Sequence, residues 1–186
     1  TKAFASAPPN SREVILVGLK PPTDADTQEF CELARRIASG STAVFLCTEV
    51  FAKGDQPTAW VPLKDKGWID LIDSCGGYYR GDTFSKRHPI FDGLPSGGIL
   101  DYTFYREIIP QGGLAWIGLS TPTEIVAAGI RANLGYGSGT LTSVYQLGAG
   151  KFILNTLNIR KNLGRDPVAE RLLRNMLCYA AQNINE

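Results

Sequence analysis

KFILNTLNIRKNLGRDPVAERLLRNMLCYA, residues 151–180, is the stretch that decides the fold of this chain. It opens with Phe152-Ile153-Leu154, a short apolar run typical of a buried strand. It ends in a predicted helix over 167–181, because Asp166 is a good N-cap and Pro167 suits the first helical position. The side chains expected to pack this helix across the sheet are Leu172, Leu173, Met176 and Leu177. A buried strand, a polar loop and an amphipathic helix form half of an α/β layer structure.

The N-terminal part of the chain predicts the parallel half of the same sheet. Residues 13–19 (EVILVGL) and 42–47 (TAVFLC) are apolar enough for buried strands. Between them lies an amphipathic helix that Thr23 or Asp24 can cap and that Ser39-Gly40 ends. A strand, a helix and a strand within ~35 residues form a βαβ unit with parallel strands.

The later half predicts antiparallel pairing beside this parallel core. We expect strands over 114–119, 124–130 and 140–147, the last joined to the strand at Lys151 by a hairpin at Gly148-Ala149-Gly150. Residues 68–72 fit a short helix or a strand, of which we favour the helix, and the prolines and glycines of 87–95 predict a loop without regular structure. The fold class is therefore α/β, a doubly wound and mostly parallel sheet with antiparallel strands in the C-terminal half.

Composition describes an ordinary globular protein. The 186 residues are 44% hydrophobic and 20% charged with a net charge of +1, so nothing favours nucleic acid as a partner. No apolar run approaches the ~18 residues of a membrane span. Residues 1–11 are predicted to be a linker without a visible signal peptide, and 12–186 a single domain. The four cysteines have no C-x-x-C spacing, so we expect free thiols rather than a zinc site, with a disulfide left open for an exported protein.

Two motifs invite a chemical interpretation, and neither is complete. Gly135-Tyr136-Gly137-Ser138-Gly139 has no following helix or lysine, so these glycines are interpreted as turn or bulge residues rather than a phosphate loop. Asp73-Ser74-Cys75-Gly76-Gly77 lacks the leading glycine of a nucleophile elbow, and His88 is the single histidine available as a base. The carboxylates have no spacing that pairs them. We therefore predict no catalytic residue, no metal ligand and no cofactor.

A ligand, if one binds, is expected where the strands end. Open α/β sheets place their ligands at the carboxyl ends of the strands. The predicted ligand-contacting residues, in the loops near that edge, are Lys20, Glu49, Arg87, His88, Asn158 and Arg160.

Three stretches give the chain a family resemblance: RHPIFDGLPSGG (87–98), GYGSGTLTSVYQLGAGKFILNTL (135–157) and NLGRDPVAERLLRNMLCYA (162–180). Together they resemble the glutamine-amidotransferase-like accessory domain found in some bacterial glycoside hydrolase family 2 chains of β-galactosidase or β-glucuronidase type. More distantly, they resemble the β-galactosidase trimerisation domain and the trehalose-utilisation proteins. The resemblance covers most of residues 12–182 and implies a flavodoxin-like fold.

The resemblance also implies what this domain does. Active amidotransferases of this type carry an elbow cysteine and a His-x-Glu after the last strands, whereas this chain reads NIRKN at residues 158–162. It is therefore expected to be a non-catalytic module whose partners are other domains of the parent hydrolase, a second copy, or carbohydrate. The parent would place it in the periplasm or outside the cell if it carries a signal peptide. The alternative is a trehalose-utilisation-like enzyme with its site at the carboxyl ends of the strands.

Overall fold

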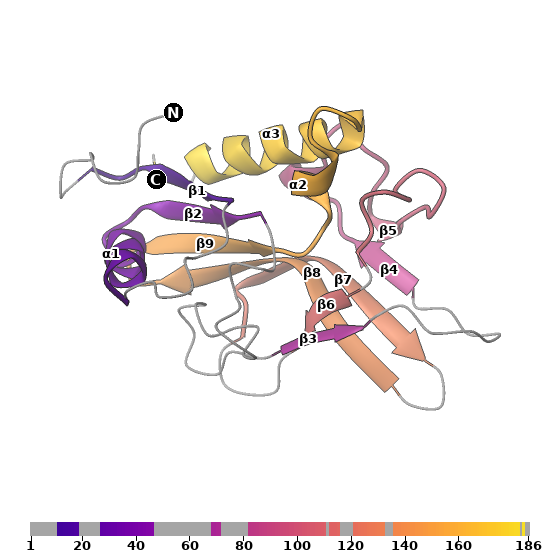
Figure 1. The fold of residues 1–186 in the computed structure, drawn as a ribbon, viewed down its shortest axis with the longest axis horizontal. Coiled ribbons are helices and arrows are strands. Elements are labelled where there is room, and N and C mark those ends of the chain that lie inside the picture. The colour runs from indigo at the N-terminus through magenta and orange to yellow at the C-terminus, as the bar shows by residue number, and fades with distance from the viewer. Residues whose placement is uncertain are drawn as a thin grey trace.

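The computed structural model describes residues 11–18, 27–46, 68–71, 82–110, 112–115, 121–132, 136–182 and 184, and Figure 1 shows how their elements are arranged. The N-terminal elements are β1 (Val14–Val17), α1 (Thr27–Ala38), β2 (Thr42–Phe45) and β3 (Trp68–Leu71). The middle of the chain forms β4 (Asp82–Ser85), the 3₁₀ helix η3 (Pro89–Phe91), β5 (Gly98–Ile99) and β6 (Gly112–Ala115). The C-terminal elements are β7 (Glu124–Ala132), β8 (Tyr136–Leu147), β9 (Gly150–Asn155), α2 (Ile159–Asn162) and α3 (Pro167–Gln182).

The 12-residue strand β8 connects two parts of one sheet. Its second half pairs with β9, from Thr142 opposite Asn155 to Leu147 opposite Gly150. Its first half pairs with β6, at Thr140 opposite Leu114. The order is β1-β2-β9-β8-β7-β4-β5, and β3 joins the sheet through β6. In Figure 1, β3 and β6 accordingly lie near the end of β8 that β9 does not reach.

The strand directions confirm a mixed α/β sheet with antiparallel pairing in the C-terminal half. β1 and β2 are parallel, as the strand–helix–strand pattern predicts, and β2 and β9 are parallel as well. Parallel pairing goes no further among the described strands, so the sheet is less parallel than the sequence suggested. For β8 and β9 the physical reason is connection length, because a parallel neighbour needs a crossover of a dozen or more residues while the two-residue turn before β9 permits only antiparallel pairing.

The two faces of the sheet carry separate apolar clusters, and a helix covers each. Along β2, Ala43 and Phe45 belong to one cluster, while Val44 belongs to the other. α1 contributes Leu33 and Ile37 to the first cluster. α3 contributes the buried residues of its apolar stripe to the second. Helices on both faces are the layering expected of a doubly wound sheet.

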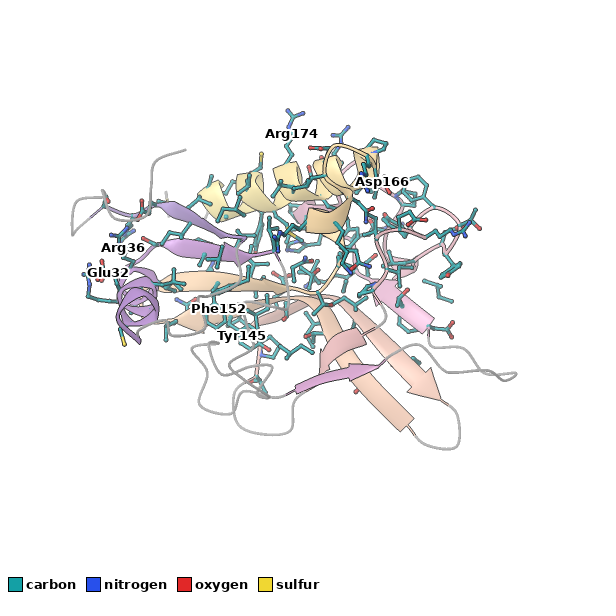
Figure 2. The ribbon with its side chains drawn as sticks, in the orientation of Figure 1. Glu32, Arg36, Tyr145, Phe152, Asp166 and Arg174 are labelled. Atoms are coloured by element: carbon teal, nitrogen blue, oxygen red, sulfur yellow. The ribbon has the colours of Figure 1, made fainter. Side chains whose placement is uncertain are left out.

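Figure 2 shows Tyr145 and Phe152 side by side in the cluster that α1 covers. They face each other across β8 and β9, and their rings stack with centroids 5.1 Å apart and planes within 6°. Phe45 meets Phe152 edge-on at 6.2 Å. Such aromatic pairs contribute about 0.5–1.5 kcal/mol beyond the area they bury, so they help to fix the register of β9.

The start of α3 is built as the sequence predicts. Asp166 Oδ1 accepts from the backbone N–H of Val168 at 2.8 Å, and Pro167 is the first helical residue. Glu170 Oε1 reaches back to accept from the N–H of Gly164 at 2.7 Å. Both carboxylates lie at the positive end of the helix dipole, which adds to the stabilisation. On the outer side of the helix, Arg174 points away from the sheet (Figure 2).

The buried stripe of α3 is narrower than predicted. Leu172 and Met176 are fully buried, as expected. Leu173 packs at the margin of the core and is partly buried, and Leu177 is also partly buried. The fully or nearly fully buried positions repeat every four residues, and they are Val168, Leu172, Met176 and Ala180, with Ala169 beside them. Leu173 and Leu177 are each rotated by one residue from this line, so they lie at its edge.

Four segments differ from their predicted conformation. Residues 68–71 form the strand β3 and not a helix, because the distant strand β6 supplies their backbone partners, Trp68 lying opposite Ala115. The 87–95 loop contains η3, whose first residue is Pro89. The polar loop after β9 contains α2. Within the glycine motif, residues 136–139 lie inside β8 and not in a turn, and a Cβ at Gly139 would lie 3.0 Å from the carbonyl carbon of Gly113.

Some predictions fall outside the described residues. These are the caps at Thr23 or Asp24, the ends of the first two strands at Leu19 and Cys47, and the Cys75 motif. None of the helices in the described ranges combines the length and apolar character that crossing a bilayer requires.

Candidate functional site

The six residues predicted to line the carboxyl edge of the sheet do not all lie together in the structure. Lys20 and Glu49 lie outside the described residues. Asn158 and Arg160 follow β9 in the segment that forms α2, while Arg87 and His88 follow β4. Whether they bind a ligand stays a prediction, but the structure does place the four described residues.

Asn158 holds α2 against the 101–109 segment. Its Nδ2 donates to the carbonyl oxygen of Ile109 at 3.4 Å, and its backbone N–H donates to that of Ile108 at 2.9 Å. Asn162, one turn later, donates from Nδ2 to the carbonyl oxygens of Glu107 and Asn158, both at 2.8 Å. The amide groups in the NIRKN sequence are therefore used within the fold, and Arg160 is exposed on the surface of α2.

Arg87 and His88 leave the sheet in a different direction from Asn158. β4 is antiparallel to β7, β7 to β8 and β8 to β9, so β4 runs opposite to β9. The chain after β4 therefore heads toward the edge at which β9 begins. Consistent with this, the partner of His88 is Glu124, which lies opposite Val144 and so level with Ile153 in the middle of β9. Asn158 lies beyond the other end of that strand.

His88 belongs to a polar cluster that the sequence did not reveal, which we call the Glu124 cluster: Lys86, His88, Glu124 and Tyr179. His88 Nε2 lies 3.2 Å from Glu124 Oε2, and Tyr179 donates its hydroxyl to the same oxygen at 3.1 Å. Lys86 Nζ donates to the other carboxylate oxygen, Oε1. The rings of His88 and Tyr179 meet edge-on at 4.7 Å. The cluster thus joins the segment after β4, the start of β7 and the last third of α3.

The two ring nitrogens of His88 have different roles. Nδ1 accepts from the backbone N–H of Ile90 at 3.2 Å and so caps η3. A nitrogen that accepts carries no proton, so the proton of the neutral ring resides on Nε2 and is donated to Glu124. The imidazole is 5% exposed, whereas the Glu124 side chain is 27% and that of Lys86 46% exposed. The cluster is therefore closed on the histidine side and open to solvent at Lys86.

The pKa values of His88 and Glu124 are both lowered, for different reasons. Burial lowers the pKa of His88, and the positive charge of Lys86 lowers it further, while the charge and hydrogen bond of Glu124 act in the opposite direction. For Glu124, burial raises the pKa, but the hydrogen bonds from Lys86 and Tyr179 and the charges of His88 and Lys86 outweigh it, so its pKa is lowered. At neutral pH the cluster therefore holds a neutral imidazole beside an ionised carboxylate.

The segment that His88 begins, residues 88–94, is fastened along α3. Asn175 Nδ2 donates to the carbonyl oxygens of Ile90 at 3.1 Å and Asp92 at 2.9 Å. Ile90 and Phe91, two residues of this segment, are fully buried in the apolar cluster that α3 shares with the sheet. The polar contacts at the ends of this segment therefore position two core side chains.

The hydrogen-bonding atoms of Glu124 and His88 already have partners within the protein. Both oxygens of Glu124 and both nitrogens of His88 have partners within the fold. Across the described ranges, no group of three or more His, Cys, Asp or Glu side chains is arranged to hold a metal ion. Glu124 and Tyr179 were not predicted, because Glu124 lies 36 residues after His88 and Tyr179 a further 55 residues on, and no local spacing pattern indicates such a meeting.

Comparison with known proteins gives a fold but no family. No family model matches the sequence, and no curated protein matches it. Among solved structures, the chain is similar to the cytoplasmic protein STM3548 from Salmonella typhimurium, with a TM-score of 0.51 and 9% identity. The match covers 89% of this chain and 70% of that one. At this identity the likeness concerns the fold alone, and it agrees with the α/β class.

Proposed function

We propose that this chain is a non-catalytic accessory domain of a larger bacterial glycoside hydrolase of β-galactosidase or β-glucuronidase type, acting through contacts with other domains, a second copy or carbohydrate. The three stretches that resemble such domains motivate the proposal. The observation that carries it is a set of exposed apolar side chains at the edge of the sheet formed by β5.

These side chains lie close together in sequence. Ile99 on β5 is 69% exposed, and Tyr102 and Phe104 in the turns after it are 63% and 43% exposed. Isolated exposed apolar residues are ordinary, but three large ones within six positions are characteristic of a contact surface. Aromatic side chains are also enriched where proteins meet.

The strand register extends this surface across the sheet. Ile99 lies opposite Phe84 on β4, and Phe84 lies opposite Ala128 on β7, so these three share one face. Ile130, two residues beyond Ala128, lies on the same face and is 44% exposed. Among the described strands, β9 and β8 are those that α1 contacts most closely, and α1 shares its apolar cluster with β1 and β2 as well. We call the whole surface, formed by Phe84, Ile99, Ala128 and Ile130 with Tyr102 and Phe104 in the turns after β5, the β5 edge.

The alternative, an enzyme of trehalose-utilisation type, requires polar side chains to converge at the carboxyl ends of the strands. In the described part of the chain, Asn158 is engaged with backbone carbonyls and His88 is directed to the Glu124 cluster. These contacts favour the accessory domain over the enzyme.

The test uses the full protein encoded by the reading frame that contains this chain. We expect that protein to hydrolyse nitrophenyl β-galactoside or β-glucuronide, and the 186-residue chain alone to hydrolyse neither these nor glutamine. Absence of glycosidase activity in the full protein contradicts the proposal. So does glutamine hydrolysis by the chain that disappears in Cys75→Ser.

The role of the β5 edge is tested in the same full protein. Ile99→Ser combined with Tyr102→Ser should change its sedimentation coefficient or weaken the cooperative melting of its domains. Leu16→Ser is the matched control, because Leu16 is 44% exposed but lies on β1 at the opposite end of the strand order. If the double variant sediments and melts like the control, the β5 edge is not the contact surface.

A further inference from the structure

His88 makes a hydrogen bond with each of its ring nitrogens, and one of the two requires the ring to be neutral. Nε2–H donates to Glu124, and the lone pair of Nδ1 accepts from the N–H of Ile90. We propose that His88 is an acid-sensitive latch: while the ring is neutral, its Nδ1 bond to the Ile90 N–H holds residues 88–94 in the capped turn that packs against α3, and a proton on Nδ1 breaks this cap and releases the segment.

The geometry explains why the proton acts at Nδ1. An imidazolium carries N–H groups on both nitrogens and has no acceptor. The bond to Glu124 survives protonation, because Nε2 is already the donor there. At Nδ1, however, two donors would face each other across the 3.2 Å that now separates this atom from the nitrogen of Ile90. The two groups must move apart, and the cap of η3 is lost.

The surroundings of the ring decide how readily His88 takes up a proton. Glu124 on β7 favours the imidazolium, Lys86 after β4 opposes it, and Tyr179 on α3 contacts the ring edge-on without a full charge. Burial of the ring is the largest influence, and it opposes the charged form. The latched state therefore binds a proton more weakly than an exposed histidine does, so acid shifts the population toward the released state.

Release has a defined structural consequence. Ile90 and Phe91, at 0% and 1% exposure, leave the core when the segment does. The contacts of Asn175 with the carbonyl oxygens of Ile90 and Asp92 are lost with it. Acid therefore uncovers apolar surface on the segment and on the part of α3 that it covers.

Proton NMR and amide hydrogen exchange on the chain test the latch between pH 7.5 and 5. Because His88 is the single histidine, its ring signals need no assignment by mutation. At pH 7.5 we expect the proton on Nε2. Below the ordinary histidine pKa of about 6.5, protection of the Ile90 amide, corrected for its intrinsic exchange rate, should fall by up to roughly tenfold per pH unit. Val144, in the middle of the sheet, should keep its protection. Constant Ile90 protection through the titration of the ring overturns the proposal.

Two variants separate the latch from a general effect of acid. His88→Asn keeps a side-chain acceptor for the Ile90 N–H but does not titrate, so its Ile90 protection should be independent of pH. Glu124→Gln removes the charge that favours the imidazolium, so the midpoint of release should move to lower pH. The same pH dependence in His88→Asn as in the wild type overturns the latch. If that variant does not fold, an unshifted midpoint in Glu124→Gln overturns it instead.

Discussion

Replacing Leu172 by alanine tests whether α3 holds the sheet together through the face described. Leu172 is 0% exposed and belongs to the larger apolar cluster. The change removes three buried carbon atoms, worth about 0.8 kcal/mol each in transfer free energy, or about 2.4 kcal/mol together. A cavity in a packed core adds to this loss, which gives an expected total of about 2–5 kcal/mol. Against a typical stability of about 5–15 kcal/mol, that loss can leave the domain marginal.

Leu173→Ala is the matched control for this experiment. It removes the same atoms from the next position of the same helix, with the same change in helix propensity, but Leu173 is only partly buried at the margin of the core. Partial burial predicts a smaller loss, of roughly 1–2 kcal/mol. Urea denaturation followed by far-UV circular dichroism measures both free energies of unfolding. If Leu172→Ala loses no more stability than Leu173→Ala, the reasoning that places Leu172 at the centre of the interface is refuted.

Three further predictions concern the cap, a close approach and pH. Asp166→Ala should lower the free energy of unfolding by about 0.5–2 kcal/mol, because the Val168 N–H loses its acceptor. In the same urea assay, Asp166→Ser should keep most of the wild-type stability, because serine also accepts this hydrogen bond. Equal losses in the two variants would contradict the capping role. Gly150→Ala should cost about 1–3 kcal/mol or more, because its Cβ would lie 2.0 Å from the carbonyl oxygen of Ile37, and a thermal midpoint like that of the wild type would show that this contact is relieved easily. Because burial lowers the pKa of His88 below its ordinary value of 6.5, the folded state binds fewer protons than the unfolded one, so stability is fully present above pH 6.5 and declines as pH falls below it. His88→Asn should flatten this slope in melts at pH 7.5, 6.5 and 5.5, and an undiminished slope would assign it to other groups.

The parts of the fold that sequence predicts are those set by neighbouring residues. The cap at Asp166 and Pro167 depends on hydrogen bonds within a few positions, and it is found as expected. The hairpin at Gly148–Gly150 is equally local, since Gly148 has φ +60 and joins two strands that pair directly. The parallel pair β1 and β2 follows from the strand–helix–strand order. In each case the chemistry that decides the conformation lies within the segment or its nearest neighbour.

The parts that sequence missed are set by distant partners. Residues 68–71 form a strand because they pair with β6, with Trp68 opposite Ala115 and Leu71 opposite Gly112. Packing against the sheet decides which residues of α3 are buried. Leu172 and Leu173 therefore look alike in a periodic pattern, and their burial differs only in the folded structure. Tertiary contacts override local preference in both cases.

The candidate site shows the same limit in a sharper form. The rule that ligands gather at the carboxyl ends of strands holds where the strands are parallel, since only then do their ends meet at one edge. β9 obeys this condition with β1 and β2, but β4 runs opposite to β9. Residues that follow β4 are therefore carried away from Asn158, and His88 meets Glu124 and Tyr179 instead. Strand direction, which depends on pairing across the whole sheet, thus decides whether a loop histidine joins the ligand edge or fastens its own segment to a helix, and here it favours the second role.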